Sequence, residues 1–141
     1  MITVDGLSKS YGDFKAVDDI SFKIRDGEIT GLLGPNGAGK TTTLRMLSCY
    51  LTPDSGSITV DEKKSAENQL DIKKMIGYLP ESAPLYADMM VFDYLKYVAE
   101  IRGITDEGRI AEVAGICRIN DVMHKNINEL SKGYKQRVGL A

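Results

Sequence analysis

A glycine-rich octapeptide limits the possible folds of this chain more than any other stretch. It reads Gly34-Pro35-Asn36-Gly37-Ala38-Gly39-Lys40-Thr41 and fits the pattern G-x-x-x-x-G-K-[ST]. The apolar run Glu28–Leu33 precedes it and is predicted to be a strand buried on both faces. Thr41–Leu51 follows it, contains no glycine or proline, and is predicted to be a helix. A strand, a glycine-rich loop and a helix in this order are the context in which the pattern binds phosphate.

Each position of the octapeptide has a physical role. Small residues let successive backbone N–H groups turn toward an anion, and Gly37 and Gly39 supply backbone freedom where a Cβ would clash. The helix that follows directs the positive end of its dipole at the same anion. Lys40 is expected to reach the β- and γ-phosphates, and the Thr41 hydroxyl to be one ligand of an octahedral Mg²⁺ ion. The loop from Gly34 to Thr42 is therefore predicted to bind ATP with magnesium.

Composition excludes several other classes of function. The net charge is −2, so no overall basic field exists to hold nucleic acid. No run approaches the roughly 18 consecutive apolar residues of a membrane span. Cys49 and Cys117 lie far apart, no Cys/His spacing resembles a zinc site, and reduced thiols are expected. The 141 residues suggest one domain.

The rest of the chain mixes strands and helices. Alternating or apolar segments predict strands at Ile2–Val4, Ala16–Ile24, Ser57–Val60 and Met75–Leu79. Helical spacing predicts helices at Val91–Arg102 and Thr105–Cys117, with Thr105 as the N-cap. The polar segment Asp61–Lys74 is predicted to be a surface excursion. This order favours an α/β fold with an antiparallel N-terminal portion.

Four sequence blocks together resemble the nucleotide-binding subunit of ATP-binding cassette (ABC) transporters. They are Leu7–Gly12, the octapeptide with Thr42, Pro53–Gly56 and Leu130–Arg137. The last block is similar to the ABC signature sequence. The resemblance covers the whole chain and implies a P-loop NTPase core with an antiparallel β portion and a helical subdomain. It implies a single partial domain, with the core at about residues 1–80, the helical subdomain at about 81–130, and the signature with the start of its helix at 130–141.

The same resemblance assigns roles to individual residues. Tyr11 would stack on adenine, and Val17 would pack near the base. The signature residues would contact the ATP of a second subunit in a head-to-tail dimer; they are Leu130, Ser131, Lys132, Gly133 and Tyr134. Lys132 departs from the usual small residue and Tyr134 from the usual glutamine. Glu81 stands where the family carries the glutamine of its Q-loop, and would reach magnesium together with Thr41.

No residue of the chain is assigned a catalytic role. In the family, an apolar strand ending in Asp-Glu and a later histidine follow the signature and activate water. Ser57–Glu62 looks superficially like that strand but precedes the signature, as does His124, the only histidine. The chain is therefore expected to be an N-terminal piece of a longer ATPase, and hydrolysis by these 141 residues alone is not expected.

The resemblance implies an ATP-binding subunit that couples ATP binding and hydrolysis to a membrane permease. Segments near Glu81, including Pro84-Leu85-Tyr86, resemble the exporter branch tied to gliding-type and multidrug-type permeases. Such a subunit would sit peripherally on the cytoplasmic face of the membrane. Two alternatives remain open at this point: a soluble ABC ATPase of translation or DNA repair, and a nucleotide-binding module without catalysis.

Overall fold

The computed structural model describes the backbone of residues 1–141 and every side chain except that of Glu107. The chain forms two compact units, Met1–Tyr78 and Leu79–Ala141. Each unit has a hydrophobic core of its own. No helix among the described residues combines the length and apolarity that crossing a bilayer requires.

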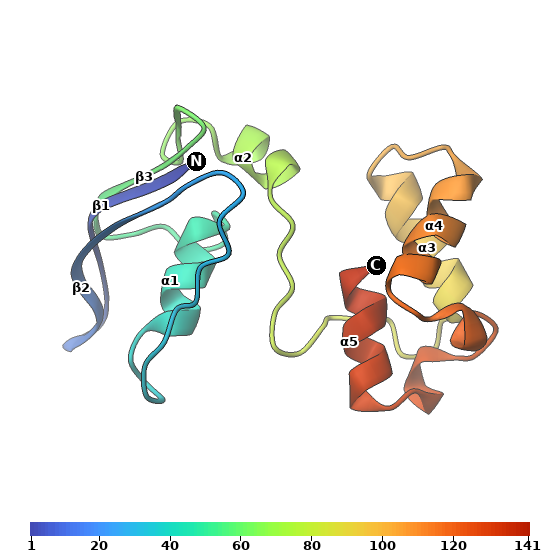
Figure 1. Cartoon of the computed structure of the whole chain (residues 1–141). Helices are drawn as coiled ribbons and strands as arrows, with labels where there is room; N and C mark the ends of the chain where they lie inside the picture. Colours follow the sequence, from blue (N-terminus) through green and yellow to red (C-terminus); the bar gives the residue numbers. More distant parts are fainter. The chain divides into compact units, whose positions relative to one another are not determined.

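The first unit is built on a four-stranded antiparallel sheet in the order β2-β1-β3-β4. Its strands are β1 (Ile2–Tyr11), β2 (Phe14–Ile24), β3 (Ser55–Val60) and β4 (Lys63–Lys64). Figure 1 labels β1, β2 and β3 of this sheet. β1 lies between β2 and β3, so that Val4 pairs with Phe22 on one side and Ile58 on the other. β1 continues well past Val4, where the sequence predicted its end, through shifts in the pairing register. The predicted antiparallel N-terminal portion is thus present.

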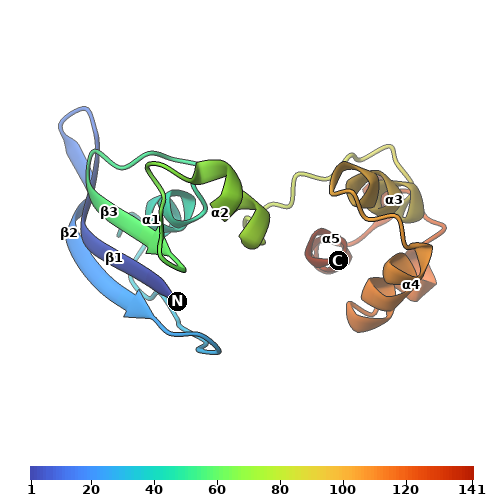
Figure 2. The same ribbon diagram turned by 90° about the horizontal axis from the view of Figure 1, so that it is seen from above.

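Two helices, α1 (Lys40–Leu47) and α2 (Gln69–Met75), cover one face of this sheet (Figure 2). Met46 of α1 and Ile72 of α2 pack into the same buried cluster as the inward side chains of the strands. The remaining members of that cluster are Val4, Leu7, Val17, Cys49, Ile58 and Val60. The predicted polar surface excursion Asp61–Lys74 is exposed or half-buried except at Ile72, and it contains β4 and α2. Ile72, near the end of this segment, is fully buried and packs α2 against the strands.

The prediction of a buried strand at Glu28–Leu33 is also wrong. The segment is irregular and lies outside the sheet, Ile29 is fully exposed, and Leu33 is 92% exposed. A strand exists only when a neighbouring strand satisfies its N–H and C=O groups. Among the described residues no strand pairs with this one. The apolar residues of this segment therefore favoured burial, but they did not show whether a neighbouring strand would pair with it.

Other boundaries differ for local reasons. The predicted strand Met75–Leu79 is absent, because Met75 ends α2 and the residues after it are irregular. The helix predicted at Thr41–Leu51 begins one residue earlier and ends at Leu47, since Cys49 has a φ of 55°, which no helix accommodates. Cys49 and Cys117 are free thiols, as expected.

The second unit is helical. It contains α3 (Val91–Ile101), α4 (Glu107–Ile116) and α5 (Lys132–Leu140), with 3-10 turns η1 (Asn120–Val122) and η2 (Ile127–Glu129) between the last two helices. A core of nine buried side chains holds them: Val91, Leu95, Ile110, Ala114, Ile119, Val122, Ile127, Leu130 and Val138. The N-cap of α4 is Asp106, whose carboxylate accepts a hydrogen bond from the Gly108 amide at 2.9 Å. The prediction of Thr105 was one residue early, and an aspartate in the next position caps equally well.

Asp54 fastens the turn before β3 to the central strand. Its carboxylate accepts hydrogen bonds from Lys9 Nζ at 2.6 Å and from the Ser10 amide at 2.7 Å. The turn also needs Gly56, which has a φ of 83° and whose added Cβ would lie 2.3 Å from the Gly6 carbonyl oxygen. The turn and β1 are therefore joined through both a side chain and a close backbone approach.

These contacts make the stability of the first unit depend on pH. The hydrogen bond from Lys9, and then that from Ser10, lower the pKa of Asp54. A carboxyl whose pKa is lower in the folded chain stabilises it above the unfolded pKa of about 4, and this contribution is lost as the pH falls through the folded pKa. We expect Asp54→Asn to lower the melting temperature at pH 7, and the difference from wild type to vanish in acid. Asp13→Asn, in the β1–β2 turn, is the control; an equal loss at every pH would contradict the assignment.

Candidate phosphate-binding site

The glycine-rich loop leads directly from Leu33 into α1 and rests on the backbone of β2. Gly39 is the N-cap of α1 and has a φ of 79°, in the left-handed region that favours glycine. A Cβ at Gly39 would lie 2.1 Å from the carbonyl oxygen of Ala16 and 3.1 Å from a Val17 methyl. The close approach that the sequence predicted for Gly39 is therefore made against β2.

Lys40 places its ammonium group over the loop. Its Nζ donates to the carbonyl oxygens of Gly34 at 2.8 Å and Pro35 at 2.7 Å, and the Ala38 amide donates to Pro35 at 3.3 Å. Three N–H donors are available on an ammonium, and the two acceptors are neutral. A phosphate oxygen, being charged, makes a stronger bond than either carbonyl. The ammonium is thus held at the loop, and it can exchange its bonds to the carbonyls for bonds to a phosphate.

The two threonines that follow differ in environment. Thr43 is 2% exposed, and its hydroxyl donates to the Gly39 carbonyl at 3.0 Å, so it serves the helix start. Thr41 is exposed in the first turn of α1. That turn contains no acidic residue, and no described side chain caps it. Its free N–H groups and positive dipole end are therefore available to an anion.

An open depression of about 360 Å³ lies between the loop and the start of β2. Its lining comes from three segments: Phe14–Asp18 with Ile20, Leu32–Leu33, and the loop residues Gly37, Ala38, Lys40 and Thr43. Val17 is buried in it, whereas Tyr11 is outside this lining and 49% exposed. Phe14, which sequence reasoning missed, lines it and is 60% exposed. Tyr11 and Phe14 face each other across the hairpin, so both side chains lie on the same side of the sheet.

The signature residues lie in the second unit, at the start of α5. Ser131 is the N-cap, and its hydroxyl oxygen accepts from the Tyr134 amide at 3.4 Å. Lys132 and Gly133 are exposed in the first turn, and Leu130 is buried in the core below. The Tyr134 hydroxyl donates to an Asp121 carboxylate oxygen at 2.6 Å. The hydroxyl of Tyr134, which replaces the expected glutamine, therefore already donates its proton within the second unit.

The two predicted metal ligands belong to different units, Thr41 to the first and Glu81 to the second. Glu81 is exposed in an irregular segment, and its backbone carbonyl accepts a hydrogen bond from the Gln136 side chain. Among the described side chains, no three His, Cys, Asp or Glu residues form a metal-binding group. Magnesium typically takes few protein ligands and completes its octahedron with phosphates and water. An exposed threonine hydroxyl beside a phosphate loop fits that ligand set.

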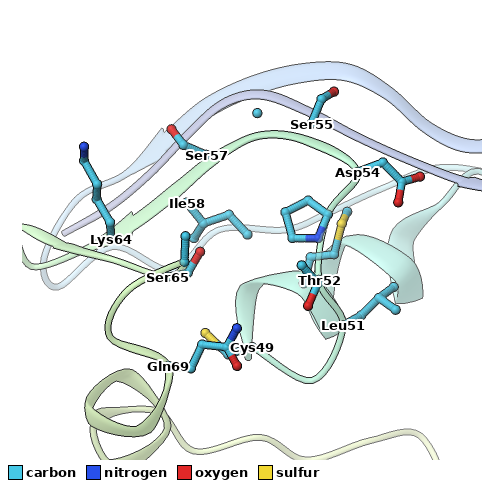
Figure 3. A pocket seen from close by; sticks show the side chains of 14 residues that line it. Cys49, Leu51, Thr52, Asp54, Ser55, Ser57, Ile58, Lys64, Ser65 and Gln69 are labelled. Carbon is cyan, nitrogen blue, oxygen red and sulfur yellow. The ribbon is translucent and has the colours of Figure 1, made fainter.

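A separate cavity of about 190 Å³ lies between the end of α1, β3 and the start of α2 (Figure 3). It is lined mainly by Cys49, the Leu51–Ile58 segment and Lys64–Ala66. Burial raises the pKa of the Cys49 thiol, so the thiol is protonated near neutral pH. Asp54 at the rim is bound to Lys9. This cavity therefore offers neither an ionised nucleophile nor an uncommitted carboxylate.

Comparison with known proteins assigns the chain to a family. Residues 17–141 match the protein family described as ABC transporter. The chain belongs to the ABC transporter family. Solved structures of ATP-binding subunits from this family have the same fold as the chain. One of them, an ATP-binding subunit of an ABC transporter, has a TM-score of 0.86 and 26% identity, over 99% of this chain and 60% of that one. The predicted α/β P-loop fold is thereby confirmed.

Named ABC relatives are more similar in sequence. The uncharacterized ABC transporter ATP-binding protein YxlF of Bacillus subtilis is 39% identical over 100% of this chain and 47% of its own length. The bacitracin transport ATP-binding protein BcrA of Bacillus licheniformis is 37% identical over 100% of this chain and 46% of its own length. The chain thus spans about half the length of these ABC relatives.

Proposed function

We propose that this chain is the nucleotide-binding part of an ABC transporter ATPase, and that it binds MgATP on the phosphate loop Gly34–Thr42. The observation that carries the proposal is the loop itself. Gly39 is packed against β2, Lys40 lies over the loop, and the uncapped start of α1 is exposed beside it. These features together present an ammonium and free backbone donors to one anion.

Each loop residue has a role in this proposal. Lys40 moves its ammonium from the loop carbonyls to the β- and γ-phosphates. The small residues of the loop surround the phosphates with backbone N–H groups; they are Gly34, Pro35, Asn36, Gly37, Ala38 and Gly39. Thr41 supplies a hydroxyl to magnesium, and Thr42 follows it in the first turn of α1. Magnesium, when bound, neutralises phosphate charge.

The adenine base is proposed to lie on the hairpin side of the loop. Val17 is buried beside Gly39 and forms part of the depression next to the loop. Tyr11 supplies the stacking aromatic ring, and the exposed Phe14 opposite it on the same side of the hairpin extends the apolar surface. Stacking a base on an aromatic ring is worth about 1–3 kcal/mol in nucleic-acid complexes.

The second unit is proposed to be the family's helical subdomain, at about residues 81–130, followed by the signature. Leu130, Ser131, Lys132, Gly133 and Tyr134 would face the ATP of a second subunit in a head-to-tail dimer. Glu81 would join Thr41 at magnesium. The integral membrane partner would be a permease, with the subunit on the cytoplasmic face. Export is the proposed direction, supported by the resemblance of the segments around Glu81 to the exporter branch.

Nucleotide binding to the full-length protein tests the proposal. We expect MgATP and MgADP to bind and AMP to bind at least tenfold more weakly, because the loop holds the β-phosphate that AMP lacks. Calorimetric titration with each nucleotide measures this difference. Similar affinities for ATP and AMP would place the main contacts on the base and overturn the phosphate-loop assignment. Recovery of the protein in the soluble fraction after expression with its permease would favour a soluble ABC ATPase instead.

A further inference from the structure

The start of α5 is tied to η1 by a pair of side chains. The hydroxyl of Tyr134 donates to a carboxylate oxygen of Asp121 at 2.6 Å. A short bond from a neutral hydroxyl to an ionised carboxylate is stronger and more directional than one between neutral groups. The bond joins the first turn of α5 to a 3-10 turn thirteen residues earlier.

Arg137 reinforces the same attachment from one turn further along α5. Its guanidinium carbon lies 5.4 Å from the centroid of the Tyr134 ring. Its Nη1 donates to the Arg118 carbonyl at 3.5 Å, just before η1. The ring of Tyr134 is therefore held at its hydroxyl by Asp121 and on its face by Arg137.

Apolar packing alone does not fix the orientation of this helix start. Val122 of η1 and Val138 of α5 are buried in one core cluster, and their burial stabilises the contact. Hydrophobic contact is not directional, however. The cap from Ser131 is a long hydrogen bond at 3.4 Å, and residues 131–133 are exposed. Directional contacts at this end of α5 therefore come chiefly from residue 134 onward.

We propose that Asp121 and Tyr134 are positioning residues, whose hydrogen bond orients the Ser131 hydroxyl and the Gly133 amide toward the ATP of the second subunit. This inference rests on the proposed function. Tyr134 takes no part in the nucleotide contact through its hydroxyl, because Asp121 accepts that proton. The contact is left to Ser131, whose oxygen accepts from the Tyr134 amide while its own O–H stays free to donate. Asp121 thus acts on the site without touching the ligand.

The test uses the full-length protein with Tyr134→Phe, Asp121→Ala and the double variant, because alanine leaves the Tyr134 hydroxyl no acceptor at position 121. A non-hydrolysable ATP analogue drives dimerisation, which analytical ultracentrifugation measures, and a fluorescent analogue reports nucleotide affinity of the monomer. We expect each single variant to weaken analogue-dependent dimerisation about tenfold, the effect of losing one hydrogen bond to a charged group. The double variant should be no weaker than either single variant, since both remove the same bond. The affinity of the monomer should change less than about twofold.

A loss of packing alone would lower the melting temperature and monomer affinity together, and that result would overturn the inference. Full dimerisation of Tyr134→Phe, or additive losses in the double variant, would overturn it as well. Tyr50→Phe is the matched control, because Tyr50 lies after α1 and is 75% exposed. Failure of the proposed function gives a different result: the wild-type monomer would then bind ATP and AMP with similar affinity.

Discussion

Lys40→Ala is expected to lower the affinity of the full-length protein for MgATP by about 100-fold or more. The ammonium lies over the loop, within 2.7–2.8 Å of two carbonyl oxygens, and is proposed to move onto two phosphates. A hydrogen bond to a charged group contributes about 1.5–3 kcal/mol, so losing one or two accounts for this factor. Titration with a fluorescent ATP analogue measures it.

The control for this variant is Lys23→Ala, which removes an exposed lysine from β2 and lies outside the depression. It should bind MgATP with wild-type affinity. Circular dichroism should show both variants folded, because Lys40 bonds only to the exposed loop that it covers. An unchanged affinity in Lys40→Ala would show that the phosphates bind elsewhere.

Gly39→Ala is expected to reduce the stability of the unit Met1–Tyr78 by about 2–5 kcal/mol. A left-handed φ costs a residue with a Cβ about 1–2 kcal/mol, and forcing an atom into a packed site costs about 1–3 more. Here the atom is a Cβ placed 2.1 Å from the Ala16 carbonyl oxygen, which is backbone and cannot rotate away. Denaturant unfolding of the full-length protein measures the loss, and nucleotide affinity should fall with it.

Gly37→Ala separates the two causes. Gly37 also has a left-handed φ, of 84°, but an added Cβ there meets nothing within 4 Å. It should therefore cost only the conformational part, about 1–2 kcal/mol. Equal losses at both positions would mean that β2 yields to the added methyl group and does not hold the loop.

The phosphate loop could be predicted from sequence because its chemistry is local. The octapeptide itself contains the small residues and the lysine that are proposed to bind phosphate. The helix after it begins within one residue of the prediction. Its support could not be predicted. That Gly39 rests on the carbonyl of Ala16 depends on the path of β2, more than twenty residues earlier. Phe14 was missed because its place beside the loop depends on the hairpin pairing with Tyr11 and on the depression that it lines.

Burial was harder to predict than local conformation. Ile29, Leu32 and Leu33 are apolar yet exposed, whereas Ile72 sits among charged residues yet is fully buried. Both observations have one cause. Burial depends on the surface that packs against a segment, and the segment's own sequence does not specify that surface. The bond between Tyr134 and Asp121 is of the same kind. The departure from glutamine was legible in the sequence, but the carboxylate that explains it was not.

The strand order of the first unit has a consequence for how the chain is made. β1 pairs with β2 across a tight turn. Its pairing with β3 joins residues much further apart, such as Ile2 and Val60. The phosphate loop and α1 lie in the chain between these two strands. On a ribosome the hairpin can form once Ile24 has emerged, while the second pairing must wait for β3 and overcome a larger loop-closure entropy. After Thr42 has been added, the nascent chain therefore carries its complete phosphate loop for about twenty residues of translation before β3 and β4 are made.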